Sequence, residues 1–127
     1  MEDWKTKLSV LWLISEFSMV VSVLLGLFES GDLTHIMPPI AVDSWSLLLI
    51  SIVMVENQAM AFLSQVLADN VNRWLNIVLG AAHSIVALAV TVLILTSGPS
   101  VLAINTATGA LWTILIVWIA WKSKQKA

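Results

Sequence analysis

Four apolar runs, each close to the roughly 20 residues that a helix needs to cross a bilayer, restrict what this chain can fold into. They cover residues 8–28, 44–67, 74–96 and 101–121. Short polar or Gly/Pro-containing segments separate the runs, as expected of turns between helices. The sequence therefore predicts an all-α fold, a four-transmembrane-helix bundle in up-down-up-down order, with residues 1–127 forming a single membrane domain.

The composition also indicates a membrane protein. Of the 127 residues, 59% are hydrophobic and 11% are charged, whereas soluble domains have roughly 45–50% apolar and about 25% charged residues. The absence of cysteine excludes disulfide exchange, thiolate catalysis and cysteine-ligated metals, and no basic cluster suits nucleic acid. We expect a multi-pass protein of the cell membrane that has the lipid bilayer as its partner.

The first apolar run has an alternative interpretation as a cleavable signal peptide. Its apolar stretch is too long for one, it contains Glu16, and no small-residue cleavage site follows it. We therefore expect residues 8–28 to form a retained helix.

The charges are sorted between the two sides of the predicted helices. All basic residues lie on one side and acids alone lie on the other: Lys5, Lys7, Arg73, Lys122, Lys124 and Lys126 against Glu29, Asp32 and Asp43. Because segments rich in Lys and Arg stay in the cytoplasm, both the N and the C termini are predicted to be cytoplasmic. So strong a bias also argues against an antiparallel dimer of oppositely inserted copies.

Each predicted helix carries a polar residue at a similar depth, given a rise of about 1.5 Å per residue. These residues are Glu16, Glu56, His83 and Thr113. An ionised side chain near the bilayer centre costs about 2.5–3.5 kcal/mol even on a lenient scale. We therefore expect these side chains to face the bundle interior, where they are paired or neutral.

The stretch VMVENQAMAF adds Asn57 and Gln58 directly after Glu56. At about 100° per residue, Glu56 and Gln58 point roughly 160° apart. The second helix therefore addresses two neighbours, either both within the bundle or one of them in a second subunit. A homo-oligomer is a reasonable expectation.

Two interpretations of this polar centre stay open. In the first, it binds or transports a small solute, proton or cation, with the acids as carriers and the imidazole, which changes charge near neutral pH, as the switch. In the second, the side chains only fix helix packing in an accessory protein that binds lipid or a partner membrane protein. The candidate ligand or ion site comprises Glu16, Glu56, Asn57, Gln58, His83 and Thr113.

No metal or cofactor site is predicted, because the sequence has neither HExxH nor a Glu-x-x-His pair. An enzyme using Glu56 and His83 as base and acid is a further alternative, but no nucleophile or metal set accompanies them. We expect a protein that is not an enzyme.

Around the third helix, Asn72 is placed to cap the helix start, and Arg73 is suited to holding a lipid phosphate through its planar fork. Capping alone also explains this turn.

Further along the third helix, Gly80 and Ser84 have a small-xxx-small spacing that permits close helix packing. We predict that this stripe packs against a similar one at residues 105–113.

Short motifs spread over most of the chain carry a resemblance. They are LSVLW in the first helix, Glu56, FLSQVL ending the second helix, NRWLNI opening the third and VWIAWK closing the fourth. Together they resemble an uncharacterised family of short prokaryotic four-helix membrane proteins. The resemblance implies the same fold and supplies no activity.

Overall fold

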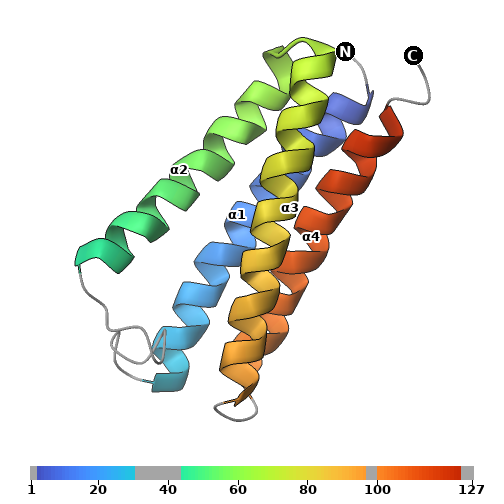
Figure 1. The fold of residues 1–127 in the computed structure, drawn as a ribbon. Coiled ribbons are helices and arrows are strands. Elements are labelled where there is room, and N and C mark those ends of the chain that lie inside the picture. The colour runs from blue at the N-terminus through green and yellow to red at the C-terminus, as the bar shows by residue number, and fades with distance from the viewer. Residues whose placement is uncertain (1–2, 31–43, 97–99, 124–127) are drawn as a thin grey trace.

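The computed structural model describes residues 3–30, 44–96 and 100–123, which form four helices. These are α1 (Asp3–Ser30), α2 (Ser44–Val66), α3 (Asp69–Thr96) and α4 (Val101–Ser123). They alternate in direction and pack as a bundle (Figure 1). The residues Asp32, Asp43, Lys124 and Lys126, used above to predict orientation, lie outside the described part of the chain.

Two helices begin earlier than their apolar runs. The first begins at Asp3 rather than Leu8, and an ion pair of 2.5 Å between Lys7 Nζ and Asp3 Oδ2 spans its first turn. The third begins at Asp69 rather than Trp74, and the backbone amide of Asn72 donates to the Ala68 carbonyl at 2.8 Å. The predicted capping role of Asn72 is therefore wrong, because this residue lies inside α3.

Among the described residues, three helices are long and apolar enough to cross a membrane. They cover residues 3–25, 69–96 and 101–123 in α1, α3 and α4, and an 18-residue stretch within each has a mean hydropathy of 2.1, 2.4 and 1.7, respectively. Their outward surfaces carry large apolar side chains such as Phe17, Ile85 and Ile104, which are 69%, 69% and 70% exposed. Contiguous outward apolar surface of this kind suits lipid better than water. The features indicate a multi-pass membrane protein.

The predicted packing of the third helix on the fourth is confirmed. A Cβ added to Gly80 would lie 3.0 Å from Val117 Cγ2 and 3.3 Å from the Thr113 carbonyl oxygen, so the missing side chain permits close approach. The Ser84 and Thr113 hydroxyls are 2.8 Å apart across the same interface. Gly109 has a different environment, because an added Cβ would meet nothing within 4 Å.

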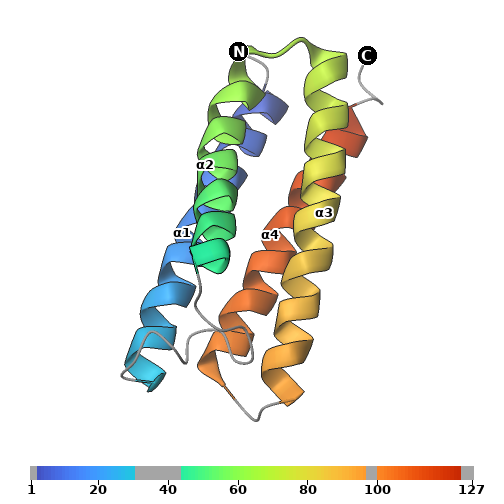
Figure 2. The same ribbon diagram turned by 60° about the vertical axis from the view of Figure 1, so that its left-hand side comes forward.

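Three of the four neighbouring helix pairs are closely packed, and the fourth, α2 with α3, is open. The first helix packs on α2 and on α4, and α3 packs on α4, whereas α2 makes few contacts with α3. Figure 1 shows that α2 and α3 meet near their connecting turn and diverge toward the other end, and Figure 2 shows the α1–α2 pair set apart from α3. Side chains that connect α2 to α3 must therefore reach across an open edge.

The first turn of α1, the last turn of α4 and the turn between α2 and α3 lie at the same end of the bundle (Figure 1). Cationic groups there lie over indole rings: Lys5 over Trp4 at 5.7 Å, Arg73 over Trp74 at 5.5 Å and Lys122 over Trp118 at 4.1 Å from ring centroids. Tryptophan with Lys or Arg is the usual pattern of a membrane interface. We call this region the basic end.

Candidate functional site

The four predicted centre residues each lie near the midpoint of a helix. Glu16 is in the middle of α1, Glu56 of α2, His83 of α3 and Thr113 of α4. Their contacts divide them into three groups. The structure thus places the predicted residues at comparable positions along their helices without joining all of them in one cluster.

The contact between Glu56 and His83 bridges the open edge between α2 and α3. Glu56 Oε2 lies 3.2 Å from His83 Nε2, and the side chains are 28% and 16% exposed. A carboxylate and an imidazole at this distance share a proton or form an ion pair, depending on protonation. This pair has the chemistry of a proton-exchanging site.

Trp12 positions the imidazole from the side of α1. Its ring meets the His83 ring edge-on, with centroids 5.4 Å apart and planes at 88°. Its indole Nε1 donates to Asn76 Oδ1 at 2.6 Å, and the side chain is completely buried. A tryptophan fixed in this way limits the positions open to His83.

The second acid, Glu16, contacts α2 rather than α3. Asn57 Nδ2 donates to Glu16 Oε2 at 3.2 Å, and Gln58 Nε2 donates to Glu16 Oε1 at 3.3 Å. Glu16 and Asn57 are buried, at 9% and 2% exposure. Since Glu56 reaches α3 while Gln58 reaches α1, the predicted two neighbours of the second helix are both inside the bundle. These contacts give no separate argument for a second subunit.

Two buried acceptor oxygens near the acids have no hydrogen-bond partner within the described chain. They are Glu56 Oε1 and Asn57 Oδ1, which belong to successive residues of α2. A third, Gln65 Oε1, lies further along α2 toward the basic end. Leaving a buried acceptor unsatisfied costs about 1–3 kcal/mol. The polar centre therefore has a surplus of acceptors.

Thr113 belongs to the α3–α4 interface. Its hydroxyl is 2.8 Å from that of Ser84 and donates to the Ala110 carbonyl at 3.0 Å. Hydroxyls that bond to the preceding turn are common in membrane helices. The geometry supports a packing role for this residue between α3 and α4.

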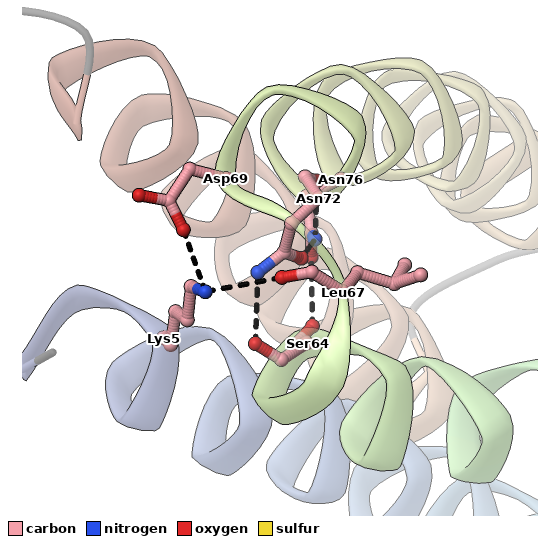
Figure 3. Close-up of polar contacts among 6 residues, drawn as sticks. All are labelled: Lys5, Ser64, Leu67, Asp69, Asn72 and Asn76. Atoms are coloured by element: carbon pink, nitrogen blue, oxygen red, sulfur yellow. Dashed lines mark hydrogen bonds and ion pairs between the residues drawn. The ribbon is translucent and has the colours of Figure 1, made fainter. Parts of the chain in front are cut away.

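A second polar cluster lies between the acids and the basic end, and the sequence analysis missed it. Asn72 Nδ2 donates to the Ser64 carbonyl at 2.8 Å, and Asn76 Nδ2 donates to the Asn72 carbonyl at 2.8 Å (Figure 3). The Ser64 hydroxyl and the Trp12 indole both donate to Asn76 Oδ1. All four side chains are fully buried. We call Trp12, Ser64, Asn72 and Asn76 the asparagine cluster.

Lys5 lies at the basic end, next to the asparagine cluster. Its Nζ donates to the Leu67 carbonyl at 3.0 Å and pairs with Asp69 Oδ1 at 2.6 Å (Figure 3). It thereby connects α1 to the turn between α2 and α3.

The sequence contains a signal for the asparagine cluster. The spacing of Asn72, Asn76 and His83 places the three side chains along one face of a helix.

Arg73 lies at the basic end, as the lipid prediction requires. Its Nη2 donates to Asn70 Oδ1 at 3.2 Å, and its guanidinium lies over the Trp74 ring. This placement is compatible with a lipid phosphate, and binding of a head group stays a prediction.

No trio of metal-ligating side chains is found at the acids within the described residues. Among residues 3–30, 44–96 and 100–123, no three His, Cys, Asp or Glu side chains are grouped so as to hold a metal ion. A shallow groove of about 280 Å³ lies elsewhere, between α1 and α4. It is lined by Thr6, Lys7, Val10, Leu11, Leu115 and Ile119.

Comparison with protein-family models, with curated proteins and with solved structures found no match for this chain. No family is therefore identified, and the chain is a four-helix all-α protein with three candidate membrane spans.

Proposed function

We propose that this chain is a cell-membrane protein that binds and passes a small cation, most simply a proton, through its polar centre. In this proposal all four helices cross the bilayer, and both termini are cytoplasmic. The α2 helix has 23 residues, which is long enough for a span. The outward apolar side chains face lipid.

The observation that carries the proposal is the Glu56–His83 contact of 3.2 Å across the open edge between α2 and α3. A group that exchanges protons must be reachable by a donor as well as paired. Both side chains are only partly buried, unlike those of the asparagine cluster. Ionisable side chains within a membrane helix commonly mark ion or proton pathways.

A second candidate function is supported by the asparagine cluster. Its side chains are fully buried and bonded to one another across α1, α2 and α3, which is how polar residues fix helix packing. An accessory protein that binds lipid or a partner membrane protein needs only this stabilising network. In that case the Glu56–His83 pair has no transport role.

Proton flux into liposomes separates the two candidates. The purified chain is reconstituted with an internal pH-sensitive dye, and a pH step is imposed under a potassium-set membrane potential. We expect flux from the native chain and its loss in Glu56→Gln and in His83→Gln, because each variant removes one proton-exchanging group. Helix content by circular dichroism establishes that each variant is folded.

Thr91→Val is the matched control. Thr91 lies in α3 and is 2.9 Å from the Thr106 hydroxyl, so the substitution removes an interhelical polar contact away from the acids. Native-level flux in this control is expected. Folded native protein that conducts no protons above empty liposomes favours the accessory role.

A further inference from the structure

The two acids of the polar centre are not equally compensated. Glu56 lies beside His83, which supplies a positive charge when it is protonated. Glu16 is contacted by the amides of Asn57 and Gln58, which carry no net charge. Among the described cations, Lys5 is bonded to Leu67 and Asp69 at the basic end. None of the ion pairs among the described residues involves Glu16, so an ionised Glu16 would have no positively charged partner there.

The contacts of Glu16 are those of an ionised carboxylate. Each of its two oxygens accepts an N–H bond, one from Asn57 and one from Gln58. An ionised carboxylate acts only as an acceptor, which matches both contacts. Because a buried charge is costly unless it is paired, the site calls for one positive charge.

One unpartnered oxygen belongs to a residue that contacts Glu16 directly. Asn57 Oδ1 belongs to the same amide whose nitrogen contacts Glu16, and Asn57 is 2% exposed. Glu56 Oε1 belongs to the preceding residue of α2, whose other carboxylate oxygen contacts His83 on α3. These are oxygen acceptors, so an anion would find only repulsion or unmatched lone pairs. A cation complements both such an oxygen and an ionised Glu16 carboxylate.

The number of charges selects a monovalent ion. Pairing with His83 accounts for one carboxylate, which leaves the single charge of Glu16. Carboxylate and amide oxygens are hard ligands that suit hard cations. The absence of a His/Asp/Glu trio among the described residues also disfavours a multivalent metal.

We propose that Glu16 and the Asn57 amide oxygen, next to Glu56, form a binding site for one small monovalent cation between α1 and α2. Na⁺, K⁺ and NH₄⁺ share the required charge, and only NH₄⁺ also donates hydrogen bonds. The inference rests on the proposed function, because the charge argument assumes that the polar centre lies within a bilayer. It adds a cation site beside the proton-exchanging pair.

The test is thermal unfolding of the chain in lipid nanodiscs at constant ionic strength. NaCl, KCl or NH₄Cl replaces choline chloride stepwise, because choline carries the same charge on a bulky quaternary nitrogen. Binding to the folded state raises the unfolding temperature with cation concentration. We expect at least one of the three ions to do so, with the apparent affinity weakened at least about tenfold in Glu16→Gln and Asn57→Leu.

Gln65→Leu is the matched control, because Gln65 also has an unpartnered buried oxygen but lies toward the basic end. It should keep the native cation response. His83→Gln should keep that response while losing proton flux, and this result separates the cation site from the proposed function. If His83→Gln loses proton flux but the native chain shows no cation response, the cation site is overturned and the proposed function is not.

Infrared spectroscopy of the native chain keeps the proposal testable even where a variant does not fold. A native unfolding temperature that is the same in all three salts and in choline overturns the proposal. So does a protonated-carboxyl band that persists in saturating Na⁺, K⁺ and NH₄⁺ and disappears only in Glu16→Gln, because a neutral Glu16 needs no cation. Absence of that band in the presence of the stabilising ion supports the site.

Discussion

At the scale of single residues, Asn76 makes the most connections in the described polar clusters. Its Oδ1 accepts from the Trp12 indole and the Ser64 hydroxyl, and its Nδ2 donates to Asn72. One buried amide thereby joins three helices. Removing the Asn76 amide would therefore lower stability, because each of its buried partners would lose a hydrogen bond.

Asn76→Leu should therefore destabilise the fold. The substitution leaves the buried indole N–H of Trp12 without its acceptor at 2.6 Å, and an unsatisfied buried donor costs about 1–3 kcal/mol. The loss is measured as the free energy of unfolding in mixed micelles. Asn70→Leu is the control, because Asn70 is exposed and should change stability by about 0.5 kcal/mol or less. Equal effects of the two substitutions would contradict the role given to the asparagine cluster.

Residue directions on α2 were predictable because they follow from helix geometry alone. An angle of roughly 160° between Glu56 and Gln58 correctly separated a contact with α3 from one with α1. Asn72 was wrongly assigned as a cap because capping preferences are local, whereas its partner is the Ser64 carbonyl on another helix. Trp12 lies in an apolar run, and nothing in its neighbours along the sequence indicates that it contacts Asn76 and His83.

At the scale of helices, close packing of α3 on α4 depends on Gly80, and Gly109 on α4 provides a comparison. Gly80 faces the Val117 side chain and the Thr113 carbonyl, whereas Gly109 faces open space within 4 Å. Both glycines lie inside helices, where replacing Gly by Ala adds about 1 kcal/mol of helix propensity. The two sites therefore receive the same local gain and differ only in packing.

Gly109→Ala should be more stable than Gly80→Ala by about 1–3 kcal/mol, the usual cost of overpacking. At Gly80 the added methyl group lies 3.3 Å from a backbone oxygen of α4, and overpacking a tight contact costs about 1–3 kcal/mol, which offsets the propensity gain. The two variants are compared by unfolding in the same micelles. A Gly80→Ala variant as stable as Gly109→Ala would show that the helices do not approach as closely as described.

The positions of the apolar runs were predictable and the helix ends were not. Hydrophobicity reports which residues suit lipid, but a helix continues into the interface wherever local bonds support it. Such bonds are the Lys7–Asp3 pair in α1 and the Asn72 amide bond to Ala68 in α3. The divergence of α2 from α3 was also not predictable, because it depends on how buried side chains such as Trp12 fill the space between helices.

At the scale of the whole molecule, the distribution of charge is the basis for the predicted orientation. The basic residues of the described part all belong to helix segments at the basic end (Figure 1): Lys5, Lys7, Arg73 and Lys122. Positive loops remain cytoplasmic in polytopic proteins. Orientation in the bilayer is thus a prediction that can be tested directly.

Single cysteines provide that test, because the native chain has none. Ala68→Cys and Lys122→Cys mark the basic end, and Thr96→Cys marks the opposite end of α3; all three positions are exposed. In intact cells, an impermeant maleimide should label Thr96→Cys and leave the other two unlabelled until the membrane is opened. Labelling of Ala68→Cys from outside would contradict cytoplasmic termini.

The account depends most on Glu56 and His83 being in contact within a lipid bilayer. Nitrogen-15 NMR of the His83 ring, in bilayers and in a His35→Gln background that leaves one imidazole, reports this contact directly. The ring signal should respond to pH differently in Glu56→Gln than in the parent, and Thr91→Val should behave as the parent does. An identical pH response in Glu56→Gln and in the parent would contradict the proposed pair.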